Sequence, residues 1–219
     1  VGTEIQVPSD ISSAAFFMVG AAITEGSDVT LEAVGINPTR TGVIEILKQM
    51  GADITVENER IAGGEPIADI RIQGTRTLKG IHMPEDQVPL AIDEFPALFI
   101  AAACAEGRTV LTGAAELRVK ESDRIQVMAD GLKTMGIDCT PTDDGIIIEG
   151  KGHSGEWGAI FTGGEIESHH DHRIAMSFSM AGLRTSGEIK IIGTETVATS
   201  FPTFTQLSNQ AGLAIQVTE

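Results

Sequence analysis

The sequence predicts an α/β fold, with α+β character, made of three repeated units that keep their helices inside and their sheets outside. Hydrophobic residues make up 42% of the 219 positions, which is enough for a sizeable buried core. Two sets of glycines recur at intervals of roughly 80 residues, which indicates an internal repeat. The two sets are Gly26, Gly107 and Gly187, and Gly51, Gly136 and Gly212.

Each unit is predicted to run helix, strand, helix, strand. The first strands read VTLEAV (29–34), TVLTGA (109–114) and IKIIG (189–193). The second helices end in related phrases that each lead into a strand, LKQMGADIT (47–55), LKTMGIDCT (132–140) and LSNQAGLAI (207–215). Two further strands, ADIRIQ (68–73) and GIIIEG (145–150), are predicted to complete small sheets.

Two kinds of helix are predicted. The first helix of each unit is small and apolar on nearly all sides, as expected for helices that pass closely in a crowded centre. The second helix of the middle unit is amphipathic, with an apolar face formed by Ile125, Met128, Leu132 and Met135. Gly136 follows and supplies the left-handed residue that ends this helix.

The charge and cysteine content exclude several classes of function. Fifteen Lys and Arg against 31 Asp and Glu give a formal net charge of -16, which disfavours nucleic acids and anionic membranes as partners. Cys104 and Cys139 have no disulfide or zinc-ligand spacing, so we expect a reduced, cytoplasmic protein. The longest apolar runs, 16–23 and 95–105, are shorter than the roughly 20 residues of a membrane span. The strand-like opening EIQV suggests a piece of a longer protein.

Polar residues collect where the first helices of the units begin. Helices that start at equivalent points should direct their N-termini the same way, and these ends present free N–H groups and partial positive charge. Asp93 lies near one such start, and counting through the repeat glycines places Ser12 and Arg173 in the same position of the other units. The sequence therefore predicts a site for phosphate or carboxylate groups.

A second polar segment, ELRVKESDRIQVM (116–128), leads into the amphipathic helix. Lys120 and Arg124 are four residues apart, so a helical first turn would project both from one side, with Glu121 beside them. Such charge clusters are also common on solvated surfaces, where they bind nothing. The mapping of this segment to a helix N-terminus favours the anion site, and both interpretations remain open at this point.

The segment ESHHDHR (167–173) has the composition of a metal site without its spacing. Adjacent side chains diverge, and His169, His170 and His172 form neither an HxxxH nor an HExxH pattern, so no metal is expected. We predict instead that Asp171 caps the following helix. Arg173 would present a planar donor to a carboxylate or phosphate.

Four motifs follow one another along the chain: IDEFPAL (92–98), ELRVKESDR (116–124), DHRIAMSF (171–178) and ATSFPTF (198–204). Together they closely resemble the C-terminal lobe of the EPSP synthase (3-phosphoshikimate 1-carboxyvinyltransferase) family. Three more segments are similar to the bacterial branch called class II, which includes glyphosate-tolerant members: NPTRTG (37–42), LKQMGADI (47–54) and EDQVP (85–89).

The resemblance implies one lobe of the enolpyruvyl transferase fold, an inside-out α/β barrel of three βαβαββ units with buried helices and external mixed sheets. Residues 1–219 would be a single C-terminal lobe of a two-lobe enzyme, with units at about 10–90, 91–168 and 169–219. The family's active site lies between the lobes, facing the helix N-termini. Without the N-terminal lobe as partner, the isolated chain is expected to be inactive.

The resemblance also implies a reaction. The enolpyruvyl group of phosphoenolpyruvate is transferred to the 5-hydroxyl of shikimate 3-phosphate, which releases phosphate in the shikimate pathway to chorismate and aromatic amino acids; no cofactor or metal is expected. Asp93 matches the family's proton acceptor, and Lys120 matches the lysine that bridges both substrates and stabilises negative charge. Glu121 matches the carboxylate that moves the proton of the methylene carbon.

Other residues match substrate contacts of the family. Arg124 and Arg173 correspond to the arginines that hold phosphoenolpyruvate, and His172 to a histidine that lines the pocket. Glu116 occupies a position that contacts shikimate 3-phosphate and is Asn in other members. Thr199 stands where enterobacterial members have lysine, which leaves the cation of the third unit unassigned. Glyphosate is the expected inhibitor.

Two alternatives fit parts of this pattern. A non-catalytic anion-binding module would use the same helix N-termini, but it would gain nothing from a carboxylate such as Asp93 in its pocket. The related UDP-N-acetylglucosamine enolpyruvyl transferases share the architecture, but are expected to lack the paired VKESDR and DHRIAMSF motifs.

Overall fold

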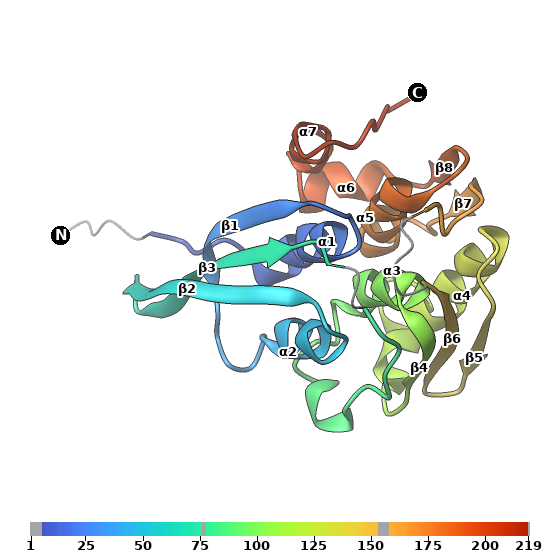
Figure 1. Ribbon diagram of the computed structural model, residues 1–219. Helices are drawn as coiled ribbons and strands as arrows, with labels where there is room; N and C mark the ends of the chain where they lie inside the picture. The colour runs from blue at the N-terminus through green and yellow to red at the C-terminus, as the bar shows by residue number, and fades with distance from the viewer. Residues whose placement is uncertain (1–5, 76–77, 153–157, 219) are drawn as a thin grey trace.

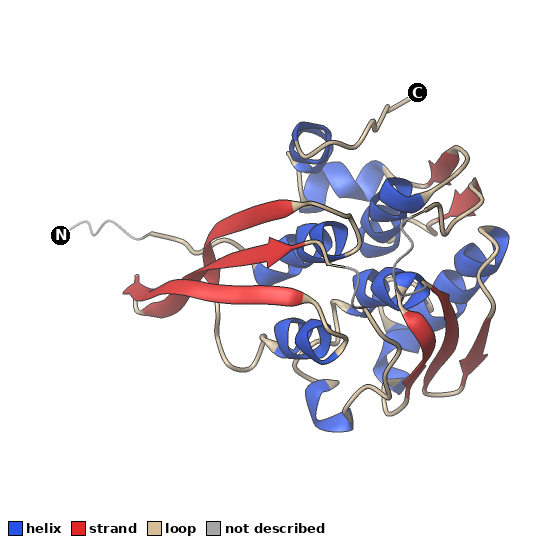
Figure 2. Ribbon diagram, viewed as in Figure 1, coloured by secondary structure: helices blue, strands red, loops and turns tan. Residues whose placement is uncertain are grey.

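Three central helices carry sheets on their outer sides in the computed structural model, which describes residues 6–75, 78–152 and 158–218. The central helices are α1 (Ile11–Ala22), α3 (Phe95–Cys104) and α5 (His172–Ala181), and each contacts the other two (Figure 1). The strands lie around them (Figure 2). This arrangement matches the prediction of buried helices and external sheets.

The first unit forms a three-stranded antiparallel sheet. After α1 it contains β1 (Asp28–Gly35), α2 (Gly42–Gln49), β2 (Asp53–Ala62) and β3 (Glu65–Gln73). The strand order is β1-β3-β2, and both outer strands run antiparallel to β3. Ser9, ahead of α1, forms a parallel bridge with Val34, so the unit follows a βαβαββ order.

The second unit repeats this plan. The 3-10 helix η1 (Glu85–Gln87) precedes α3, which is followed by β4 (Glu106–Leu111), the 3-10 helix η2 (Ala115–Val119), α4 (Arg124–Thr134), β5 (Cys139–Thr142) and β6 (Gly145–Lys151). The strand order β4-β6-β5 corresponds to that of the first sheet. Lys79 and His82 bridge in parallel to β4, as Ser9 does to β1.

The third unit has only part of this plan in the described residues. Strand β7 (Gly164–Glu167) pairs in parallel with β8 (Ile189–Ile192), and the helical segments after β7 are α5, the 3-10 helix η3 (Gly182–Arg184), α6 (Glu195–Ser200) and α7 (Phe204–Gln210). The strand predicted at the end of LSNQAGLAI is wrong, because residues 213–218 form none. The side-chain amide of Asn209 instead bonds both the N–H and the carbonyl of Ile215, at 2.7 and 3.0 Å, and so occupies groups that a sheet would use.

The packing explains the two helix types. All ten residues of α3 are buried, as expected for a helix that is apolar on all sides. The predicted face of α4 is confirmed, since Ile125, Met128 and Leu132 are fully buried. Gly131 allows α4 to approach α5, because a Cβ there would lie 2.3 Å from the ring of Phe178. Gly136 has a φ of 83°, which confirms the left-handed end of α4.

Cys104 and Cys139 are buried free thiols. No helix within the described residues is both long enough and apolar enough to cross a membrane.

Candidate active site

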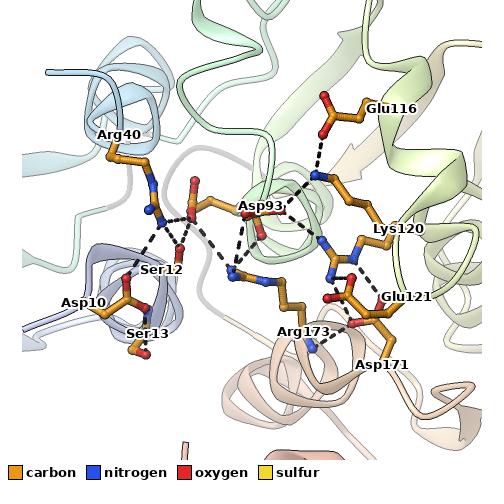
Figure 3. Close-up of polar contacts among 12 residues, drawn as sticks. Asp10, Ser12, Ser13, Arg40, Asp93, Glu116, Lys120, Glu121, Asp171 and Arg173 are labelled. Atoms are coloured by element: carbon orange, nitrogen blue, oxygen red, sulfur yellow. Dashed lines mark hydrogen bonds and ion pairs between the residues drawn. The ribbon is translucent and has the colours of Figure 1, made fainter. Parts of the chain in front are cut away.

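Asp93 lies at the centre of a polar cluster at the N-terminal ends of α3 and α5 (Figure 3). It directly precedes Glu94, the N-cap residue of α3. The Oδ1 atom of Asp93 is 3.5 Å from the Lys120 ammonium and 3.3 Å from Nη1 of Arg124. Its Oδ2 atom is 3.9 Å from Nη2 of Arg173. Three cations from two units therefore surround one carboxylate.

These cations set the protonation state of Asp93. Burial raises the pKa of its carboxyl, but the charges of Arg173, Lys120 and Arg124 outweigh this effect, so that the pKa lies below its usual value. Asp93 is therefore ionised at neutral pH. It becomes a stronger base when an anionic ligand takes up the charge of its neighbours.

Lys120 and Arg124 reach Asp93 by a different route from the one predicted. Helix α4 begins only at Arg124, because Asp123 is its N-cap and accepts a hydrogen bond from the N–H of Gln126 at 3.0 Å. Lys120 is an extended residue that ends η2, so the predicted shared helical turn is wrong. Its ammonium bonds Glu116 at 2.5 Å, and this bond, together with the charge of Asp93, raises the pKa of Lys120.

Arg124 is the most enclosed cation of the cluster. Its side chain is fully buried. Its Nε donates to Asp171 at 2.9 Å, its Nη2 to Glu121 at 2.5 Å and its Nη1 to Asp93 at 3.3 Å. The interpretation of this segment as a solvated charge run is therefore wrong for Arg124, which joins three carboxylates from both units.

Asp171 caps α5, as predicted. Its Oδ1 accepts the N–H of Arg173 at 3.0 Å, and its Oδ2 accepts the hydroxyl of Ser122 at 3.0 Å. The residue is fully buried. Burial raises the pKa of Asp171, but the hydrogen bond and charge of Arg124 outweigh it, so that the pKa is lowered. Asp171 therefore stays ionised between the two helices.

The three histidines do not converge. His169 and His170 have positive φ angles of 52° and 59° in the turn before α5, and His170 contacts Glu195 at 2.5 Å. His172 is the first residue of α5, and burial, followed by the charge of Arg173, lowers its pKa. The described residues contain no group of three His, Cys, Asp or Glu residues arranged to hold a metal ion.

A second part of the cluster was missed from the sequence. Arg40, in NPTRTG, donates from Nη2 to Ser12 at 2.7 Å and lies 3.9 Å from Oε1 of Glu94. Ser12 in turn donates to Glu94, which is buried beside Arg173. Ser12 lies in the cluster at the N-terminal end of α1, as the repeat predicted, and Arg40 adds a cation from the first unit. Thr199 lies on the exposed part of α6.

The cluster combines groups for anion binding and proton transfer. Lys120, Arg173 and the partly exposed Arg40 supply positive charge beside the N-termini of α1, α3 and α5. Asp93, ionised and partly exposed, supplies a base next to this charge. An anionic substrate with a hydroxyl to deprotonate fits this arrangement.

The chain matches known proteins over nearly its whole length. A family model described as EPSP synthase (3-phosphoshikimate 1-carboxyvinyltransferase) matches residues 1–207. The 3-phosphoshikimate 1-carboxyvinyltransferases of Nitrosococcus oceani and Methylococcus capsulatus are 63% and 64% identical over 215 residues, which is 98% of this chain. The same matches cover 46% and 47% of those proteins, so the chain spans about half the length of the curated relatives it matches.

Solved structures confirm the fold. An EPSP synthase from Acinetobacter baumannii is 88% identical with a TM-score of 0.98, and the match covers 100% of this chain and 49% of that one. The enolpyruvyl transferase NikO from Streptomyces tendae is 16% identical with a TM-score of 0.71, over 97% of this chain and 45% of that one. At that identity NikO shows the shared fold alone, and it supports the predicted α/β lobe.

Proposed function

Because the chain belongs to the EPSP synthase (3-phosphoshikimate 1-carboxyvinyltransferase) family, we propose that it forms the C-terminal lobe of an enzyme that transfers an enolpyruvyl group. The donor is phosphoenolpyruvate, the acceptor is the 5-hydroxyl of shikimate 3-phosphate, and the products are EPSP and phosphate. The observation that carries this proposal is Asp93, a carboxylate held among Lys120, Arg124 and Arg173. A simple anion receptor would exclude such a carboxylate from its site.

Asp93 is proposed to take the proton of the attacking hydroxyl. The hydroxyl oxygen bonds to the substituted carbon of phosphoenolpyruvate while the methylene carbon gains a proton, which gives a tetrahedral adduct. Loss of a proton from the new methyl group then expels phosphate and restores the double bond. The anionic substrates would engage Lys120 and Arg173, weaken their hold on Asp93 and so raise its pKa towards that of an effective base.

Glu121 and Arg124 are proposed to act as a linked pair. Glu121 is 53% exposed and bonds Nη2 of the buried Arg124. A phosphoenolpyruvate anion that takes this donor would release the Glu121 carboxylate to move the methylene proton. Lys120 would stabilise the negative charge of the adduct, as positioned cations do in anionic transition states.

The remaining residues of the cluster are proposed to contact one substrate or the other. Arg173 would bind phosphoenolpyruvate with Arg124, and His172, whose pKa is lowered, would line that pocket as a neutral group. Glu116 would contact shikimate 3-phosphate next to Lys120. Glyphosate is proposed as an inhibitor at this site, and an N-terminal lobe as the partner that completes it. The buried free thiols support a cytoplasmic location.

A chimera tests the proposal. This chain replaces the matching half of the Acinetobacter baumannii enzyme, to which it is 88% identical. We expect the chimera to release phosphate from phosphoenolpyruvate only when shikimate 3-phosphate is present, and the isolated chain to release none. Phosphate release by the isolated chain, or none by a folded chimera, would contradict the proposal.

Asp93→Asn in the chimera separates the enzyme from the anion-binding module. Loss of a general base lowers kcat by about 100-fold or more. The matched control is Asp28→Asn, which removes an exposed carboxylate paired with Arg71 on the outer sheet. Equal rates for Asp93→Asn and the control would favour the module.

A further inference from the structure

Glu94 is a buried carboxylate to which the proposed reaction assigns no role. It occupies the N-cap position of α3, yet its side chain makes no capping hydrogen bond there. Its side chain is only 1% exposed. The carboxylate points instead to donors from the other two units, since Oε1 accepts the hydroxyl of Ser12 and lies 3.9 Å from Arg40 and 3.8 Å from Arg173.

Arg173 is held without a short carboxylate contact in the described part of the chain. Its Nη1 donates to the backbone oxygen of Asp93 at 3.2 Å. The carboxylates of Glu94 and Asp93 lie 3.8 and 3.9 Å from its guanidinium, which is beyond hydrogen-bond length (Figure 3). These contacts orient the charge of Arg173 and leave its strong donors available for another anion.

We infer that Glu94 is a positioning residue for Arg173, held in place by Ser12 and Arg40, and that it directs the guanidinium towards a ligand carrying phosphate and carboxylate groups. The identity of that ligand as phosphoenolpyruvate rests on the proposed function. The first unit thereby contributes to the site through Ser12 and Arg40, although both are far from Arg173 in the sequence.

The surroundings of Glu94 fit this role better than a tie between helices. A residue that only linked α1 to α3 would need no more than the hydrogen bond from Ser12, and the two arginines beside Glu94 would be unnecessary. Burial raises the pKa of Glu94 above its usual value, and Ser12, Arg173 and Arg40 offset only part of that effect. An ionised Glu94 therefore depends on both arginines, and the orientation of Arg173 depends in return on Glu94.

Glu94→Gln in the chimera tests the inference. Because one charged contact to Arg173 is lost, we expect phosphoenolpyruvate affinity, measured by 31P NMR titration without the second substrate, to fall about tenfold. The KM for phosphoenolpyruvate should rise in parallel, while kcat and the KM for shikimate 3-phosphate stay within about twofold. Glu94→Asp, which keeps the charge, should recover part of the loss.

Controls separate positioning from folding. Glu149→Gln removes a carboxylate that pairs with Arg108 on the outer sheet and should leave affinity unchanged. Ser12→Ala removes the donor that holds Glu94, together with an acceptor for Arg40, and should weaken phosphoenolpyruvate binding in the same direction, even if Glu94→Gln does not fold. Unchanged affinity in both folded variants would overturn the inference.

A double-mutant cycle with Arg173→Lys decides whether Glu94 acts through Arg173. If it does, Glu94→Gln should have no further effect on affinity in the Arg173→Lys background. Additive losses would overturn the inference. A parent chimera that binds phosphoenolpyruvate without turnover would contradict the proposed function alone, whereas one that does not bind it would contradict both.

Discussion

Arg124 and Arg173 are both proposed to bind phosphoenolpyruvate, yet their side chains lie in opposite environments. Arg124 is fully buried, and its three nitrogens donate to three carboxylates at 2.5 to 3.3 Å. Arg173 is 16% exposed, and its carboxylate neighbours lie at 3.8 and 3.9 Å. The guanidinium of Arg124 is already hydrogen-bonded to three carboxylates of the protein. The guanidinium of Arg173 is held in orientation, but its carboxylate neighbours are too distant for hydrogen bonds.

This difference indicates how one residue type can serve both stability and binding. Removing one partner of a buried ion pair leaves the charge of the other partner uncompensated where water cannot solvate it. A partly exposed charge with long contacts costs little to remove, because water replaces its partners. We therefore expect Arg124 to matter first for folding and Arg173 first for ligand affinity.

The largest effect is expected for Arg124→Met in the 219-residue chain. It leaves Asp171 buried without its guanidinium and should lower the free energy of unfolding by about 3–5 kcal/mol, measured by urea denaturation. Adding Asp171→Asn should restore part of this loss, because the buried charge is removed with its partner. An Arg124→Met chain as stable as the parent would remove the distinction between the two arginines.

Arg173→Gln should show the opposite pattern. Its free energy of unfolding should fall by about 1 kcal/mol, which is less than for Arg124→Met, because the lost ion pairs are long and the buried Glu94 keeps Arg40 as a neighbour. In the chimera, phosphoenolpyruvate affinity should fall by about 10- to 100-fold, since a charge-assisted contact is lost. Strong destabilisation with normal affinity would show that Arg173 is a structural residue.

The pH dependence of stability should report Asp171. The pKa of Asp171 is lower in the folded chain than in the unfolded chain. Its contribution to stability is therefore fully present above its pKa in the unfolded chain, and it is lost as the pH falls through its pKa in the folded chain. Urea denaturation from neutral pH into the acid range should therefore show a shallower loss of stability for Asp171→Asn than for the parent. Parallel curves would mean that Asp171 does not contribute to acid unfolding.

The smallest effect is expected for Glu149→Gln. The Arg108–Glu149 contact is 2.7 Å, as short as those of Arg124, but its side chains are 63% and 39% exposed. We expect a change in unfolding free energy of less than about 0.5 kcal/mol by the same urea measurement. A larger loss would show that contact length, and not burial, separates Arg124 from the surface pairs.

Local patterns predicted those parts of the site that depend on one helix end. The repeat placed Ser12, Asp93 and Arg173 together at the N-terminal ends of the central helices. Asp171 caps α5 because an aspartate before an apolar helix can bond its free N–H groups. The predicted helical turn at Lys120 failed because a second aspartate, Asp123, caps α4 later.

The amino-acid sequence by itself determined the repeat, the capped start of α5 and the residue types near the N-termini of the central helices, because these follow from periodicity and from side chains near their own backbone. Only the tertiary structure decided which charges meet. Ser12 and Glu94 lie 82 residues apart and come together because α1 and α3 pack side by side. Burial then enclosed Arg124 among three carboxylates and left Arg173 partly exposed, since solvent access depends on neighbours from distant segments.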